Sequence, residues 1–206
     1  MKKIIITSRM AIWSLSESTP YGQWNRQADN QLLKLNNVDK WVLISISGHD
    51  EDLISNEQFK VLQGKGCLDI LLLKFDDING RIFKIILEKY EKRGYDIKKE
   101  NFVYFSDNDA EAIIEFADRH KNIETMIIHC AAGISRSGAT GCFLAEKYGI
   151  SAKNIFDAHP YLEPNEEIVN RLFSVAGRDY QNFLEWFYRY DNKVAQNFPI
   201  DYRLNI

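Results

Sequence analysis

The sequence has few cysteines, and their spacing suits neither a disulfide framework nor a zinc site. The three cysteines, Cys67, Cys130 and Cys142, lie far apart, and no two form a Cys-x2-Cys pair. An odd number of unpaired cysteines is typical of a reducing compartment. We therefore expect free thiols in a cytoplasmic protein that holds no metal and no other cofactor.

Long apolar runs and a large excess of one charge are also missing. No stretch approaches the roughly 18 apolar residues of a membrane span. The first apolar run ends at Ser8 and Arg9, too early for the core of a signal peptide. The formal net charge of −3 provides no electrostatic footprint for nucleic acid or an anionic membrane. Neither partner is expected, and the oligomeric state is left open.

The composition that remains is that of an ordinary globular protein. Of the 206 residues, 45% are hydrophobic and 27% are charged. There is no internal repeat, low-complexity tract or linker rich in proline, glycine or serine. A chain of this length can bury a substantial core, so we expect residues 1–206 to form a single domain.

Short apolar segments alternate with helical patterns along the chain. We expect strands at Ile4–Thr7, Trp41–Ile46, Ile70–Phe75 and Thr125–His129, with a brief extended segment at Phe102–Phe105. We expect helices within 25–40, over Arg81–Lys92, after the capping residue Ser106, over Ser137–Tyr148, over Ser151–Ile155, from about Asn165, and over Arg178–Tyr190. This alternation predicts an α/β fold with a mostly parallel central sheet flanked by helices on both faces.

Chemically useful side chains follow two of the predicted strands. Cys130 stands at the end of one strand, and Asp76 and Asp77 follow another. Parallel sheets bind ligands at the carboxyl ends of their strands. The pattern therefore predicts a nucleophile and two carboxylates at one edge of the sheet.

The loop after Cys130 is suited to holding a phosphate. Its residues are Ala131, Ala132, Gly133, Ile134, Ser135 and Arg136. Backbone N–H groups in such a loop, together with the following helix N-terminus, favour a dianion, and the small side chains leave the concavity open. The planar fork of Arg136 can bind two phosphate oxygens at once. The same amides and the helix dipole favour the thiolate form of Cys130, which is the form that attacks phosphorus.

The run from His129 to Gly138 matches the Cys-x5-Arg signature of the cysteine-dependent protein tyrosine phosphatases. It resembles the dual-specificity branch and its compact bacterial relatives, most strongly over residues 70–170. The resemblance implies a protein tyrosine phosphatase-like fold and metal-independent hydrolysis of phosphomonoesters through a phosphocysteine intermediate on Cys130. The alternative interpretation is that Cys130 is a buried structural cysteine at the end of a strand.

The resemblance also implies a general acid, an Asp on a loop upstream of the nucleophile. Asp77 is the preferred candidate, because related bacterial sequences place the acid in such a Phe-Asp-Asp-Ile stretch. Asp76 is the second candidate. Asp107 and Asp109 lie nearer to Cys130 in the sequence, but they occupy a helix-capping context, where the structural role of Asp is the more common one.

Three further residues take supporting roles by resemblance. Ser137 matches the hydroxyl that hydrogen-bonds the cysteine sulfur and assists its departure, and a helix N-cap is its other role. His129 matches the residue that orders the loop through backbone hydrogen bonds. Asn165 resembles the Asn of a Pro-Asn pair that braces the loop, with helix capping as the alternative.

The neutral side chains of the loop favour a simple substrate. Ala131, Ala132 and Ile134 offer no charge to a second phosphate, so we expect a phosphorylated protein or a small phosphomonoester. A phosphate-binding pseudophosphatase or interaction module without turnover is the alternative. Thiol redox chemistry, such as arsenate reduction, requires a resolving cysteine, and Cys142 is a poor candidate because its periodicity places it on the buried face of a helix.

Overall fold

The chain is described here by a computed structural model that places residues 1–16, 40–78, 92 and 102–188. These residues form one sheet of parallel strands in the order β1-β4-β2-β3. The strands are β1 (Lys3–Ser8), β2 (Trp41–Ser47), β3 (Cys67–Lys74) and β4 (Thr125–Cys130). All four lie on the apolar segments that the sequence predicts as strands.

The register of the strands brings their carboxyl ends to one edge of the sheet. Ser8, the last residue of β1, pairs with Cys130, the last residue of β4. On the other side of β4, Ser45 of β2 pairs with His129, and Ser47 at the end of β2 pairs with Lys74 of β3. The segments that follow the four strands therefore start from the same edge, here called the carboxyl edge.

Alternate residues of the strands fill two separate cores. One face of the sheet carries Ile4, Ile6, Val42, Ile44, Ile46, Leu73, Met126 and Ile128. The other face carries Ile5, Trp41, Leu43, Cys67 and Ile127. Strands that are apolar on both faces need cover on both faces, as expected for a parallel sheet.

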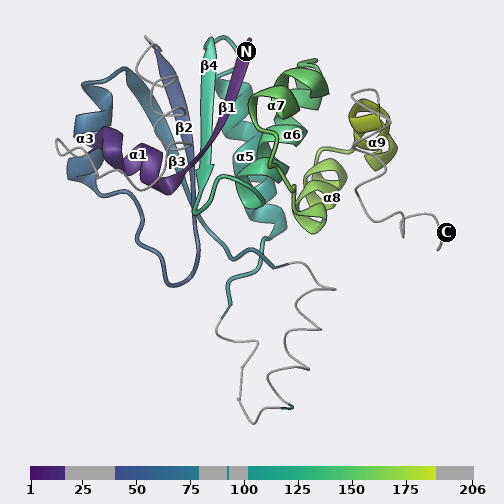
Figure 1. The fold of residues 1–206 in the computed structure, drawn as a ribbon, viewed down its shortest axis with the longest axis horizontal. Coiled ribbons are helices and arrows are strands. Elements are labelled where there is room, and N and C mark those ends of the chain that lie inside the picture. Colours follow the sequence, from purple (N-terminus) through teal and green to yellow (C-terminus); the bar gives the residue numbers. More distant parts are fainter. Residues whose placement is uncertain (17–39, 79–91, 93–101, 189–206) are drawn as a thin grey trace.

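Helices provide that cover on each side of the sheet (Figure 1). The smaller core is closed by α1 (Arg9–Ser16) and α3 (Asn56–Gln63). The larger core is closed by α5 (Asp107–Arg119), α6 (Arg136–Lys147), α7 (Ala152–Ala158), α8 (Glu166–Val175) and α9 (Tyr180–Tyr188). The predicted α/β fold with helices on both faces is confirmed.

Most predicted helices are present, with differences at particular elements. Ser106 caps α5 and Asn165 caps α8 as the sequence suggests. The segment Phe102–Phe105 belongs to no strand of the sheet. Helices α1 and α3 were not predicted from the sequence. The helices expected within 25–40 and over Arg81–Lys92 lie outside the described residues, except for Lys40 and Lys92 at their ends, which are not helical.

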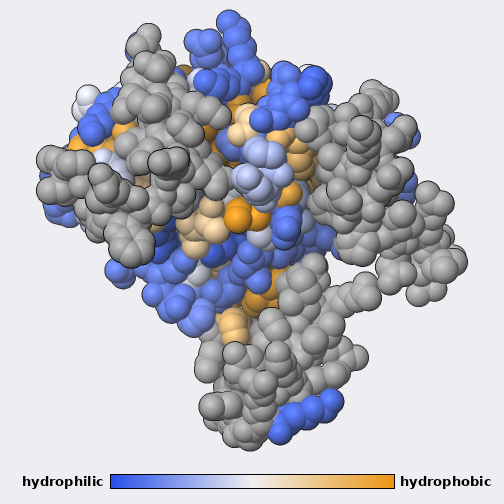
Figure 2. Space-filling view, in the orientation of Figure 1, coloured by the Kyte–Doolittle hydropathy of each residue, from blue (hydrophilic) through white to orange (hydrophobic). Residues whose placement is uncertain are grey.

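The outer surface of the described part is largely hydrophilic in the view of Figure 2, with smaller hydrophobic areas between the hydrophilic residues. No helix among the described residues combines the length and the apolarity needed to cross a bilayer.

Candidate active site

Cys130 lies at the end of β4, which has β1 on one side and β2 on the other. Its Sγ atom is 3.1 Å from the Oγ atom of Ser137, within hydrogen-bonding distance. Ser137 is fully buried and is the second residue of α6. The N-cap position of α6 belongs to Ser135, so the alternative interpretation of Ser137 as the N-cap is wrong. Its hydroxyl faces the sulfur.

Gly133 lets the loop between β4 and α6 pack directly against the end of β1. Its φ of +75° lies in the left-handed region, which side chains disfavour. A Cβ atom at this position would lie 2.5 Å from the carbonyl carbon of Thr7. The Arg9 N–H also donates a hydrogen bond of 3.2 Å to the carbonyl oxygen of Ala131. The shape of the loop is therefore set by the backbone of a neighbouring strand.

The N-terminus of α6 has no side-chain cap. Ser135 makes no capping hydrogen bond, whereas Ser106 of α5 and Ser151 of α7 both accept one from the helix backbone. The Ser135 hydroxyl instead donates to Asp77 Oδ1 at 2.7 Å. The first N–H groups of a helix need an acceptor from outside the helix, so the α6 N-terminus is suited to binding an anion beside Cys130.

Arg136 is buried, and one of its terminal nitrogens is anchored. Nη1 donates to the carbonyl oxygen of Phe75 at 3.0 Å and lies 3.5 Å from Glu51 Oε2. Nε is buried and has no hydrogen-bond partner among the described residues. A buried guanidinium donor without a partner is costly, and an oxyanion would satisfy it.

Asp77 is tied to the loop by two hydrogen bonds. Its Oδ1 atom accepts from the hydroxyl of Ser135 at 2.7 Å and from Nδ2 of Asn165 at 2.9 Å. Asn165 also caps α8, and its backbone N–H donates to the carbonyl oxygen of Ser135 at 3.3 Å. Asn165 therefore has both of the roles that the sequence left open, since it caps a helix and contacts the loop.

Asp76 is occupied by other partners, although it is adjacent to Asp77 in sequence. Its carboxylate accepts from the backbone N–H of His49 at 2.9 Å and from that of Val103 at 2.8 Å, and His49 Nδ1 lies 3.0 Å from Oδ1. Burial raises the pKa of Asp76, but these hydrogen bonds outweigh it, so the net pKa is below the ordinary value. Such a carboxylate is held in its ionised form.

The two carboxylates of α5 interact with other elements. Asp107 forms an ion pair of 2.8 Å with Arg171 on α8. Asp109 completes a capping box with Ser106 at the start of α5. No hydrogen bond joins either carboxylate to the loop in the part of the chain that the structure describes.

His129 lies behind the loop in a fully buried position. Neither of its ring nitrogens has a hydrogen-bond partner among the placed residues. The pKa of His129 is lowered to about 3, chiefly by burial and also by the positive charges of Arg9 and Arg136, against an opposing effect of the Cys130 backbone. The ring of His129 therefore does not make the backbone hydrogen bonds that the resemblance implies for this residue, within the part of the chain that is described.

Three residues of the carboxyl edge were not predicted from the sequence. Arg9 directly follows β1, while His49 and Glu51 follow β2. The rule that selected Asp76 and Asp77, namely inspection of the residues after each strand, would have found all three. His49 and Asp76, together with Asp50, also form the one group of possible metal ligands detected among the described residues.

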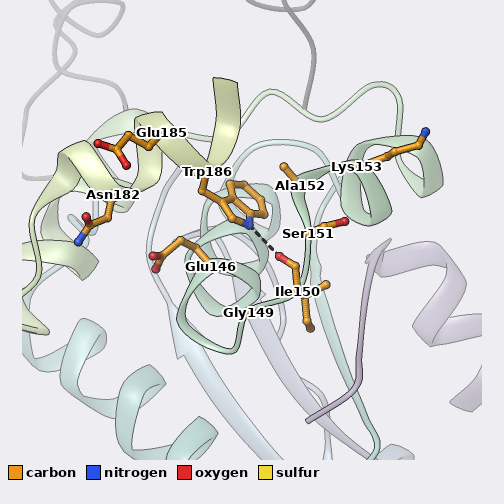
Figure 3. Close-up of a pocket in the computed structure, with 9 residues that line it drawn as sticks. All are labelled: Glu146, Gly149, Ile150, Ser151, Ala152, Lys153, Asn182, Glu185 and Trp186. Carbon is orange, nitrogen blue, oxygen red and sulfur yellow. Dashed lines mark hydrogen bonds between the residues drawn. The ribbon is translucent and has the colours of Figure 1, made fainter. Parts of the chain in front are cut away.

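The cavity shown in Figure 3 is a separate feature. It has a volume of about 410 Å³ and lies between the end of α6, the start of α7 and α9. Trp186 lines it and donates through Nε1 to the carbonyl oxygen of Ile150 at 2.7 Å. The loop that follows Cys130 is at the other end of α6, roughly 15 Å away by helix geometry. No predicted site residue lines this cavity.

No family model and no curated protein matches this sequence. Among solved structures, a human tyrosine phosphatase-like serine/threonine/tyrosine-interacting protein is 16% identical, with 72% of this chain and 83% of that chain covered and a TM-score of 0.40. The PTP-2 phosphatase of Cydia pomonella is 19% identical, with 74% and 81% covered and a TM-score of 0.36. The core catalytic domain of the PP-IP phosphatase SIW14 from S. cerevisiae is 14% identical, with 95% and 98% covered and a TM-score of 0.37.

By name, these three proteins are phosphatases or phosphatase-like, the class that the Cys-x5-Arg run resembles. At this level of identity and TM-score, the likeness carries no argument about mechanism or substrate.

Proposed function

We propose that this protein is a metal-independent phosphomonoester hydrolase that acts through a phosphocysteine intermediate on Cys130, in the manner of protein tyrosine and dual-specificity phosphatases. The observation that carries the proposal is the grouping of three features at one edge of the sheet. They are the Cys130 sulfur 3.1 Å from the Ser137 hydroxyl, the buried Nε of Arg136 without a partner, and the Asp77 carboxylate bound to the loop.

In the first step, the Cys130 thiolate attacks phosphorus and the bond to the ester oxygen breaks. The N–H groups of residues 131–136 and the guanidinium of Arg136 hold the oxygens of the transferring phosphoryl group. Asp77 gives its proton to the leaving oxygen. A positioned acid typically contributes about 10²–10⁴-fold to such a step.

In the second step, water attacks the phosphocysteine and the thiolate leaves. Asp77, now ionised, accepts a proton from the water, and Ser137 donates a hydrogen bond to the departing sulfur. The hydrogen bonds from Ser135 and Asn165 to Asp77 Oδ1 leave Oδ2 for these proton transfers.

Asp77 fits the acid role better than the other three carboxylates. It is exposed and bonded to a residue of the loop, whereas Asp76 accepts hydrogen bonds from His49 and Val103. Asp107 pairs with Arg171, and Asp109 caps α5. Asp77 is therefore the carboxylate that can exchange a proton next to Cys130 without giving up a structural role at the end of a helix.

The proposed substrate is a phosphorylated protein or a small phosphomonoester in the cytoplasm. Ala131, Ala132 and Ile134 add no charge to the loop, which favours a single phosphate group. Thiol redox chemistry is disfavoured, because Cys142 is fully buried and burial raises its pKa. A thiol in that state does not resolve a disulfide readily.

The test is hydrolysis of an aryl phosphate at mildly acidic pH in the presence of a chelator. We expect turnover by the wild type, none by Cys130→Ser, and a loss of about 10²–10³-fold in kcat for Asp77→Asn. Asp118→Asn is the matched control, because Asp118 lies on α5 and pairs with Lys147. Turnover retained in Cys130→Ser, or dependent on a divalent ion, would contradict the mechanism.

Two further variants separate the remaining alternatives. Asp107→Asn should leave kcat near the wild-type value, and a large loss there with none in Asp77→Asn would move the acid to α5. Tight binding of inorganic phosphate without any turnover would instead support the pseudophosphatase.

A further inference from the structure

Glu51 links two guanidinium groups at the carboxyl edge. Its Oε2 atom accepts a hydrogen bond of 2.8 Å from Nη2 of Arg9 and lies 3.5 Å from Nη1 of Arg136. The backbone N–H of Gly48 donates to the same oxygen. One carboxylate oxygen on the loop after β2 is therefore shared between the end of β1 and the start of α6.

All three charged side chains are shielded from solvent. The exposed fractions are 11% for Arg9, 21% for Glu51 and 8% for Arg136. Ion pairs that are this enclosed are screened far less than pairs at the surface. The group contains two positive charges and one negative charge, so a positive charge remains uncompensated beside the loop. A bound anion would compensate this positive charge.

Arg9 is itself held in place from several directions. Its Nη2 atom donates to the hydroxyl of Ser47 at 2.8 Å, and its guanidinium lies 5.5 Å from the centre of the Trp13 ring. Its backbone N–H donates to Ala131 of the loop. A side chain with this many fixed contacts can restrain the carboxylate that it binds.

The anchoring of Arg136 explains why such a restraint matters. A guanidinium is planar, so fixing Nη1 through Phe75 and Glu51 also fixes the opposite edge, formed by Nε and Nη2. That edge is one of those with which arginine binds two oxygens of a phosphate together. If Glu51 turned away, only one anchor would hold the plane, and the edge would lose its fixed direction.

We propose that Arg9 is a positioning residue for Arg136 and acts through Glu51. Arg9 holds Glu51, Glu51 holds Nη1 of Arg136, and the Nε edge of Arg136 is thereby directed into the loop, where the substrate phosphate binds. This inference rests on the proposed function, in which Arg136 holds the phosphoryl oxygens.

A double-mutant cycle of Arg9→Gln and Glu51→Gln tests the inference. The primary readout is the affinity for tungstate, a phosphate mimic, measured by calorimetry on variants that also carry Cys130→Ser. We expect each single substitution to weaken binding about tenfold, which corresponds to about 1.4 kcal/mol. If Arg9 acts through Glu51, the double variant should be little weaker than either single variant.

Arg171→Gln is the matched control, because it removes an arginine whose ion pair is with Asp107 of α5 rather than with Glu51 or Arg136. It should bind tungstate like the parent. Multiplied losses in the double variant, or an Arg9→Gln affinity equal to that of Arg171→Gln, would overturn the inference. If Arg9→Gln does not fold, Glu51→Asp provides the same test, because it keeps the charge and withdraws the carboxylate. Parent-like affinity in Glu51→Asp would also overturn the inference.

Failure of this inference can be told apart from failure of the proposed function. Tungstate binding needs no turnover, so a non-additive cycle in a protein that hydrolyses no aryl phosphate would sustain the role of Arg9 and reject the hydrolase. Turnover by the wild type, combined with an additive cycle, would support the hydrolase and reject the role of Arg9. In an active enzyme, Arg9→Gln should lower kcat/KM about tenfold and Arg171→Gln should not.

Discussion

The buried ring of His129 makes the stability of the fold depend on pH. The pKa of this histidine is about 3 in the folded chain, against 6.5 for an ordinary histidine, mainly because burial disfavours the charged ring. At a pH between these two values, His129 binds a proton in the unfolded chain and remains neutral in the folded chain. Folding stability is therefore complete above pH 6.5 and is lost as the pH falls toward 3.

The size of the effect follows from the linkage relation. Each pH unit inside this window costs about 1.4 kcal/mol per proton. Lowering the pH from 7 to 5 should therefore remove about 2 kcal/mol of the free energy of unfolding through His129 alone. Asp76 and Asp118 have pKa values below the ordinary range. Their contributions to the free energy of unfolding are therefore lost only at a pH below this interval.

Urea unfolding at pH 7, 6 and 5 measures this contribution. His129→Asn should flatten the dependence of the unfolding free energy on pH by about one proton, whatever its effect on stability at pH 7. His120→Asn is the matched control, because His120 is only half-buried and its Nε2 atom is hydrogen-bonded to Asp69 Oδ2 at 2.8 Å. A His129→Asn protein with the wild-type slope would refute the reasoning.

Three further predictions concern the loop and its surroundings. Gly133→Ala should abolish tungstate binding, because its Cβ would lie 2.5 Å from the backbone of Thr7, and parent-like affinity would contradict this packing. Gly149→Ala shares a positive φ but faces open space, so urea unfolding should show a loss of only about 1–2 kcal/mol, with turnover unchanged. Ser137→Ala should slow phosphocysteine hydrolysis about 10–100-fold and produce a burst of phenolate in stopped-flow experiments, because Cys130 loses its 3.1 Å partner. An unchanged steady rate without a burst would argue against that role.

Much of the fold could be predicted because the apolar segments are short and well bounded. The run Thr125–His129 is apolar at its three central residues, and it lies in the fully buried strand β4. Helix α5 was equally clear, because Ser106 and Asp109 supply both halves of a capping box. Local chemistry and tertiary packing agree at these positions.

The two missed helices show what local patterns do not supply. Helix α3 does carry a signal, since Ser55 and Gln58 form a capping box, but only Leu62 of the helix itself is fully buried. Helix α1 has no acidic residue in its first turn and no basic residue in its last. Its stability comes from packing Ile12 and Leu15 against the sheet, which only the assembled fold reveals.

The sequence predicts which residues lie at the site better than it predicts which of them contact one another. Cys130 and Asp77 could be placed at one edge because strand ends converge there. The sequence could not tell that Ser135 would bond to Asp77 or that Glu51 would lie between two arginines. Such partnerships depend on the lengths and directions of loops, for which no sequence period exists.

The pairing of Asp76 with Val103 has a consequence for remodelling the protein. The Asp76 N–H donates to the Val103 carbonyl at 2.8 Å, and the Val103 N–H donates to the Asp76 carboxylate at 2.8 Å. The chain that departs after Asp77 thus re-enters beside its point of departure. Adjacent ends of this kind tolerate circular permutation and domain insertion.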